Sequence, residues 1–417
     1  MTGSDSFLGV RQLILARLGL YPDIPRLSHL SSIKKSHCRA VLNWLQNYQP
    51  SSDASNLEKV RGYLEAFHHL IELKAWEAAK HVAFAKSQEN PKIRLAWQLG
   101  NWGYYKEQQG LHLKLLDKID DATNAACLNS LGIAYRNFGK NAEAISCFHK
   151  CLSITRKIDD QSGLQSALAN LGTTFCFLNR YAEALECLWK SLSLAREIGD
   201  YHAEGSILGS LGIVFWRQQS HLLAASFFKE WLDMSRDLGD LGSEAKALAN
   251  LGNVCRELGD YNQAIEYLNL SLLIAHEISD PNSEQSALSG LGNLYGSLGQ
   301  YKKAVEYLDQ NLRLSQKLKD RRGEAIALMN LGNACSYLCR KEAAHKYFQK
   351  SLAITREVGD RATEVTALHN FAEFYYQSGD SELALKYCKE AETLASSLNL
   401  PILQKCQELS EVVAASL

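Results

Sequence analysis

A pattern that returns every forty residues restricts the fold of this chain more than any other feature of its sequence. A Leu-Gly pair occurs six times at an unbroken spacing of 40, and Phe371-Ala372 takes its place in a seventh unit. The pairs begin at Leu131, Leu171, Leu211, Leu251, Leu291 and Leu331. A Leu stands three residues before each pair, and an Ala stands thirteen residues after its first member. Residues that recur at the same places in seven forty-residue units indicate a repeat array.

The spacing of these residues within one unit predicts a helix. Leu288, Leu291, Gly292 and Tyr295 fall at i, i+3, i+4 and i+7, which is one face of a helix. Gly in a helix interior costs roughly 1 kcal/mol against Ala. Its recurrence therefore predicts a close approach of a second helix, with the recurring Ala, such as Ala304, opposite it. Each unit is predicted to be a helix–turn–helix hairpin that buries its apolar face by stacking on its neighbours.

At these positions the sequence resembles the tetratricopeptide repeat family, whose signature is met by Leu291, Gly292, Tyr295, Ala304 and Leu308. The usual repeat of that family has 34 residues. The forty-residue form is similar to the repeats of Partner-of-Inscuteable adaptors and of many bacterial arrays. The resemblance covers residues 121–400 strongly and 55–120 weakly. It implies an all-α, right-handed superhelical solenoid of antiparallel helix pairs, in which the first helix of each pair lines a concave face.

The regularity of the pattern divides the chain into four predicted parts. They are an N-terminal helical segment (1–50), irregular helix pairs (55–120), seven forty-residue repeats (121–400) and a C-terminal capping helix (401–417). Within the first part, one short helix is expected over residues 1–20 and a second from Ser31 or Ser32 to about Tyr48. Among the irregular pairs, helices are expected over 63–73, 76–84 and 111–119. The capping helix should point Cys406 and Val413 inward.

Composition and charge exclude several classes of protein. The net charge is −1, so no bulk field draws the chain to nucleic acid or to an anionic membrane. No apolar run is long enough to span a bilayer, and the N-terminus lacks a secretory pattern. The 11 cysteines include no Cys-x-x-Cys, and Cys127, Cys255 and Cys335 occupy apolar helical positions, as reduced, buried thiols do. We predict a cytoplasmic protein with neither a nucleic-acid partner nor membrane insertion.

The sequence also lacks the motifs of common catalytic sites. It contains no phosphate-binding Gly-rich loop, no Gly-x-Ser-x-Gly and no His-Glu-x-x-His. Cys147-x-His149-x-Cys151 is the nearest approach to a metal cluster, but His149 points away from the face that the two cysteines share. We therefore predict no enzyme, no catalytic residue, no metal and no cofactor.

The resemblance implies which residues face the groove. They are the residue two places after the Leu of Leu-Gly, together with those two before it and five or six after it. The predicted groove residues are Asn253, Asn293, Asn333, Arg256, Lys246, Arg217 and Trp216. The small residues Gly209, Ala249 and Ser289 are expected to leave room for a ligand beside them.

Three Asn residues at one phase need an explanation, because Asn is a poor helix former. Its side chain offers donors and an acceptor, which suits it to hold the backbone of an extended peptide. The alternative is that each Asn faces water or a neighbouring helix. Ile213 and Glu373 interrupt the row in other units.

The sequence therefore predicts a non-enzymatic scaffold or adaptor that binds an extended peptide segment of another protein on its concave face. Arg217, Lys246 and Arg256 should favour acidic side chains or a terminal carboxylate in that segment. The alternative is a peptide- or ligand-gated sensor whose N-terminal helices respond to occupancy of the groove. Bacterial peptide-responsive regulators of this family and arrays attached to signalling ATPases are built in that way.

Overall fold

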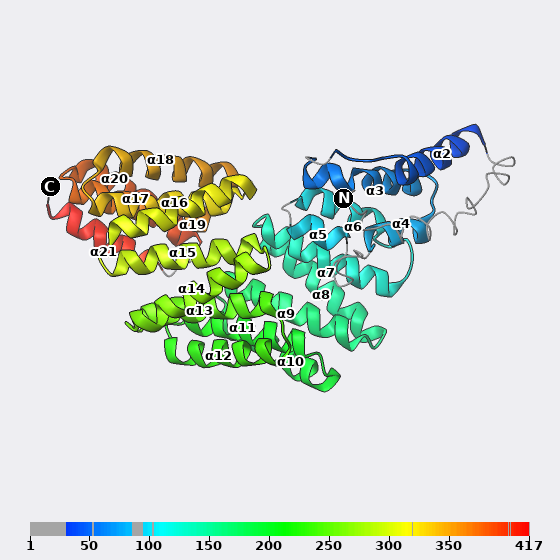
Figure 1. The fold of residues 1–417 in the computed structure, drawn as a ribbon, viewed down its shortest axis with the longest axis horizontal. Coiled ribbons are helices and arrows are strands. Elements are labelled where there is room, and N and C mark those ends of the chain that lie inside the picture. Colours follow the sequence, from blue (N-terminus) through cyan, green and yellow to red (C-terminus); the bar gives the residue numbers. More distant parts are fainter. Residues whose placement is uncertain are drawn as a thin grey trace. The chain divides into compact units, whose positions relative to one another are not determined.

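The computed structural model describes residues 31–51, 54–85, 95–101, 104–318, 320–398, 400 and 402–416. Within these ranges the chain forms α-helices and no strand, which confirms the predicted all-α class (Figure 1). No helix in the described part of the chain is both long and apolar enough to cross a membrane. The helix expected over residues 1–20 lies outside the described residues.

Each forty-residue unit forms one helix–turn–helix hairpin, and the hairpins follow one another in chain order. Their helices are α7 (Asp121–Asn137) and α8 (Asn141–Lys157), α9 (Gln161–Phe177) and α10 (Tyr181–Ile198), α11 (Tyr201–Arg217) and α12 (His221–Asp237), α13 (Leu241–Glu257) and α14 (Tyr261–Glu277), α15 (Pro281–Ser297) and α16 (Tyr301–Leu318), α17 (Arg321–Tyr337) and α18 (Lys341–Val358), and α19 (Arg361–Gln377) and α20 (Ser381–Ser397). The array of antiparallel helix pairs predicted from the spacing is confirmed.

The helices on either side of the array are less regular. Before it come α2 (Ser32–Gln46), α3 (Asn56–Glu72), α4 (Trp76–Ala83), α5 (Leu95–Asn101) and α6 (Tyr105–Leu115). After it comes α21 (Leu403–Ala414), which buries Cys406 and Val413 as predicted. The helix expected over 111–119 is wrong in both limits. It starts at Tyr105 and ends at Leu115, because Leu116 is extended and Asp117 has a positive φ of 59°.

The chain divides into two compact units, one that ends at Thr174 and one that begins at Phe175. This boundary falls within α9, inside the regular array. The four-part division predicted from the sequence followed the regularity of the repeats, which the compactness of the fold does not measure. It stays a prediction.

The recurring acids of the array cap helices and pair with Arg. The side chain of Asp200 accepts a hydrogen bond from the backbone N–H of Ala203, at the start of α11. One turn into the same helix, Glu204 pairs with Arg196 of the preceding helix at 2.6 Å. The pairs Arg236–Glu244 and Arg356–Glu364 repeat this arrangement, each at 2.8 Å. These carboxylates therefore have a structural role at the junctions between hairpins.

Five glycines of the Leu-Gly pairs each lie against a large side chain of the second helix: Gly132, Gly212, Gly252, Gly292 and Gly332. An ideal Cβ on Gly252 would stand 2.6 Å from Leu268 Cγ and 3.3 Å from the carbonyl oxygen of Ala264. At Gly212 and Gly332 the facing residues are Phe228 and Phe348. The predicted close approach of the two helices is confirmed. The facing side chain is the Leu or Phe sixteen residues after the glycine rather than the recurring Ala expected there.

The predicted burial of the cysteines is also confirmed. Cys127, Cys255 and Cys335 are all buried in the core. Burial raises the pKa of the Cys127 thiol to about 12, so this group stays protonated near neutral pH. Cys339, in the turn between α17 and α18, is exposed.

Candidate functional site

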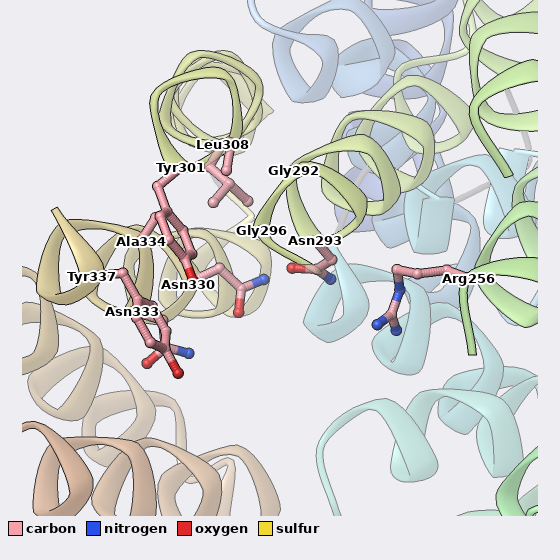
Figure 2. Close-up of a pocket in the computed structure, with 11 residues that line it drawn as sticks. Arg256, Gly292, Asn293, Gly296, Tyr301, Leu308, Asn330, Asn333, Ala334 and Tyr337 are labelled. Carbon is pink, nitrogen blue, oxygen red and sulfur yellow. The ribbon is translucent and has the colours of Figure 1, made fainter. Parts of the chain in front are cut away.

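The compact unit that begins at Phe175 contains a pocket of about 220 Å³, which lies on the first helices of three consecutive hairpins. Its lining comes from α13, α15 and α17, with α16 closing one side (Figure 2). The lining residues are Arg256, Gly292, Asn293, Gly296, Tyr301, Ala304, Leu308, Asn330, Asn333, Ala334 and Tyr337. Three of the predicted groove residues, Asn293, Asn333 and Arg256, therefore meet at one pocket.

The third predicted asparagine has a different environment. Asn253, on α13, does not line the pocket. Its Oδ1 atom would lie 3.3 Å from an ideal Cβ on Gly290 of α15, so its amide sits against the neighbouring first helix. For Asn253 this contact fits the alternative interpretation, in which Asn packs on the next helix.

Arg256 brings a positive charge to the pocket. Its Nη1 donates to Ser297 Oγ at 3.3 Å, and its Nη2 lies 2.5 Å from Glu257 Oε1. Only 20% of its side chain is exposed, and its Nε is buried without a hydrogen-bond partner among the described residues. Ser297 and Glu257 hold the guanidinium in place, so little conformational entropy remains to be lost when it binds an anion.

The other three predicted groove residues lie outside this pocket. Lys246 is exposed, and Trp216 is half-buried. Arg217 is exposed, with its guanidinium carbon 5.6 Å from the centre of the Phe177 ring. Arg256 is thus the one Lys or Arg among the described residues that line the pocket, and Lys246, Arg217 and Trp216 stay predictions as ligand contacts.

The small residues predicted to leave room for a ligand do so only in part. An ideal Cβ on Gly209 would lie 2.7 Å from the ring of Trp231, and Ala249 is buried. The space beside Gly209 is therefore filled by the indole of the second helix, where other units carry smaller residues such as Ser271 and Ser351. The expectation of a ligand space at Gly209 is wrong, whereas Ser289 is half-exposed.

Three polar residues of the pocket are not among the predicted groove residues. Asn330 precedes Asn333 by one helical turn on the same face, a spacing that could have revealed it. In Figure 2 the amide groups of Asn293 and Asn330 point toward one another. Tyr301 and Tyr337 stack with ring centres 4.7 Å apart and an angle of 6° between the rings. These two residues come from different hairpins, so no spacing within one unit could have paired them.

The Cys147-x-His149-x-Cys151 segment does not form a cluster of ligands. Cys151 is buried and its Sγ lies 3.2 Å from the carbonyl oxygen of Ala125, whereas His149 is exposed. In the described ranges, no group of three or more His, Cys, Asp or Glu side chains could hold a metal ion.

The fold and the pocket define a class of protein, a helical-hairpin array with a polar pocket on its first helices. Comparison with protein families then identifies the repeats. One tetratricopeptide repeat profile matches residues 123–197, 163–237, 243–310 and 283–357, and a second matches 365–397. These matches cover more than half of the chain, which therefore belongs to the tetratricopeptide repeat family. A comparison with curated proteins gave no match.

Solved structures of low sequence identity share the fold. A Rap protein complexed with Competence and Sporulation Factor has 15% identity and a TM-score of 0.59, with 82% of this chain and 99% of that chain covered. The Rap conjugation gene regulator of the plasmid pLS20, in complex with the Phr* peptide, has 16% identity and a TM-score of 0.53, with 85% of this chain and 90% of that chain covered. A Signal Transduction ATPase with Numerous Domains protein with a tetratricopeptide repeat sensor, from Pyrococcus horikoshii, has 17% identity and a TM-score of 0.52, with 96% of this chain and 57% of that chain covered. At these identities the likeness concerns the fold alone.

Proposed function

We propose that this protein is a non-enzymatic scaffold that binds an extended peptide segment of a partner protein. The segment lies along the first helices α13, α15 and α17. The observation that carries the proposal is the pocket in which Asn293, Asn330, Asn333 and Arg256 converge. Primary amides can donate to the carbonyl groups and accept from the N–H groups of an extended backbone. Structural neighbours solved with Competence and Sporulation Factor and with the Phr* peptide support a peptide as the ligand.

Arg256 gives the proposed ligand a chemical preference. Its guanidinium lines the pocket and is fixed by Ser297 and Glu257. A planar guanidinium forms paired hydrogen bonds with a carboxylate. We therefore expect an acidic side chain or a terminal carboxylate of the peptide at this end of the pocket.

The test starts from peptides selected by the wild-type protein from a displayed random library. Calorimetric titration of a selected peptide into the double variant Asn293→Ala with Arg256→Ala should show binding weakened about 30-fold or more. The reason is the loss of one neutral contact, at roughly 0.5–1.5 kcal/mol, and one charged contact, at roughly 1.5–3 kcal/mol.

A matched double variant controls for the composition of the change. Asn262 is an exposed residue of the second helix α14, and Arg313 is an exposed residue of α16 paired with Asp309. Asn262→Ala with Arg313→Ala should leave the affinity unchanged. Equal affinities of wild type and Asn293→Ala/Arg256→Ala, with both folded by circular dichroism, would place the binding surface elsewhere.

A second candidate function is a peptide-gated sensor in which the N-terminal helices respond to occupancy of the groove. The division of the chain into two compact units favours it, because a switch needs parts that can respond separately. Small-angle scattering with and without a saturating selected peptide distinguishes the two. A change of the scattering curve on binding supports the sensor, whereas superimposable curves support a passive scaffold.

A further inference from the structure

The row of groove residues ends in a carboxylate that pairs with no Lys or Arg of the described residues. Glu373 stands forty residues after Asn333, so α19 carries an acid where α15 and α17 carry amides. It is half-buried, and its Oε1 accepts a hydrogen bond from Gln377 Nε2 at 3.2 Å. The junction acids such as Glu204 are paired with Arg, whereas Glu373 forms no ion pair within the described part of the chain. Its negative charge is available to a ligand.

An aromatic ring lies on α17, the first helix of the preceding hairpin, which contacts α19. Tyr337 lines the pocket, one helical turn after Asn333, and its ring is stacked on that of Tyr301. With 54% of Tyr337 exposed, a face of the ring is open to a bound molecule. Burial, and after it the charge of Glu373, raises the pKa of Tyr337. The same negative potential that disfavours a phenolate would stabilise a cation on the ring.

We propose that Tyr337, Glu373 and Asn333 form a subsite for the guanidinium or ammonium group of an Arg or Lys side chain in the bound peptide. The subsite rests on the proposed peptide-binding function and adds a partner chemistry opposite in charge to that of Arg256. The carboxylate pairs with the cation, the open face of Tyr337 stacks on it, and the amide oxygen of Asn333 accepts a hydrogen bond. Arg fits better than Lys, because a planar guanidinium can stack and form hydrogen bonds at once.

The two charged ends make the predicted ligand dipolar. Arg256 is on α13 and Glu373 is on α19, three hairpins later, with α13 contacting α15, α15 contacting α17 and α17 contacting α19. At roughly 8–10 Å for each step between helices, the axes of α13 and α19 are about 25–30 Å apart. An extended peptide covers that span with roughly eight residues. The ligand should therefore carry an acid and a base roughly eight residues apart.

The experiment pairs a change in the peptide with a change in the protein. Peptides are selected from a displayed random library, and one that contains a required Arg is synthesised with that Arg and with neutral, nearly isosteric citrulline. In titrations against wild type, citrulline should weaken binding about tenfold. Against Glu373→Gln, which can keep the contact with Gln377, the same peptide change should matter by about twofold or less. Glu342→Gln, an exposed acid of α18, is the matched control and should behave as wild type.

The outcomes separate this subsite from the proposed function. An equal loss on citrulline substitution in wild type and Glu373→Gln overturns the subsite, as does a selected set without Arg or Lys enrichment. The proposed function is judged by a different variant, Asn293→Ala with Arg256→Ala. If that variant binds the selected peptides as tightly as wild type, or if wild type selects no peptide, the proposed function fails. Selection of no peptide overturns the subsite as well.

Discussion

At the scale of single residues, the two helices of a hairpin are matched by volume. The glycine of a pair faces Phe148, Phe228, Leu268, Leu308 or Phe348. In the last unit Ala372 replaces the glycine, and Cys388, a smaller residue, takes the place of the Phe or Leu in the same core cluster. The bulky Trp231 is accommodated by Gly205 and Gly209 on the facing helix. Close packing requires such pairs of large and small residues.

Gly252 of α13 and Gly296 of α15 should therefore respond in opposite ways to substitution by Leu. Gly252→Leu should destabilise the protein by roughly 1–3 kcal/mol, because its side chain must displace Leu268. At Gly296, an ideal Cβ meets no atom within 4 Å. Gly296→Leu should cost nothing and gain up to about 1 kcal/mol of helix propensity. Thermal melts of the two variants check this, and a melt of Gly252→Leu equal to that of wild type would contradict the packing account.

A buried imidazole in the first unit makes stability depend on pH. His112 of α6 is 1% exposed, and neither of its ring nitrogens has a hydrogen-bond partner among the described residues. Burial lowers its pKa to about 4, against about 6.5 in the unfolded chain. The unfolded state thus binds a proton first. The stability that depends on a neutral His112 is fully present above about pH 6.5 and is lost as the pH falls from there toward about 4.

We expect this one group to remove roughly 2 kcal/mol of stability between pH 7 and pH 5. His112→Leu should lessen the fall, and it should stabilise the protein at pH 7 because the unpaired polar atoms are gone. Urea denaturation at the two pH values measures both effects. His149→Leu, at an exposed position of α8, is the control. A fall of the same size in wild type and His112→Leu would show that other groups cause it.

At the scale of elements, the turns inside the hairpins need a left-handed residue. Gly139, Gly259, Gly299 and Gly379 supply it with φ between 69° and 87°. Gln219 and Cys339 hold the same place in other hairpins with φ of 60° and 55°. A side chain in this conformation costs roughly 1–2 kcal/mol, which glycine avoids.

Cys339→Gly should accordingly stabilise the protein by about 1 kcal/mol, less the entropy that glycine adds to the unfolded chain. Cys339→Ala removes the same exposed thiol but keeps a Cβ in the left-handed conformation, so it should bring no gain. Chemical denaturation of the two variants and wild type provides the comparison. Equal stability of the Gly and Ala variants would mean that the turn is not strained.

The elements that follow the forty-residue phase could be predicted from the sequence, and the others only in part. The hairpins between Asp121 and Ser397 were predicted because Leu, Gly and Ala recur at fixed places in each. In α6 no such pattern exists. Its first turns carry Lys106 and Glu107, and Gln108 is buried despite its polarity, so the start at Tyr105 was missed. Local periodicity reveals a helix only when its buried face is apolar.

The candidate site shows the same limit. Asn293, Asn333 and Arg256 were predicted because the family resemblance assigns their positions on the first helices to the groove. The contact of Asn253 with Gly290, the filling of the space beside Gly209 by Trp231 and the stacking of Tyr301 on Tyr337 each join residues of different helices. Such contacts depend on tertiary packing, which the spacing of residues along the sequence does not specify.

At the scale of the whole molecule, the packing positions of the repeats stay nearly constant while the groove position changes along the array. The junction acids, the glycines and the core Leu residues hardly vary between units, whereas the groove positions run from Ile213 through the asparagines to Glu373. The invariant residues build one hairpin after another. The variable ones give the first helices a chemistry that changes along the array, with a cation at Arg256 and an anion at Glu373.

The central claim, that a peptide lies along the first helices α13, α15 and α17, is tested most directly by photo-cross-linking. A peptide selected by the wild-type protein is resynthesised with a benzophenone side chain near its middle, irradiated in complex with the unmodified protein, and the attachment site is mapped by mass spectrometry. The account predicts cross-links to α13, α15 and α17, abolished by an excess of the unlabelled peptide. Competed cross-links confined to α2–α6, or to the second helices α14 and α18, would contradict it.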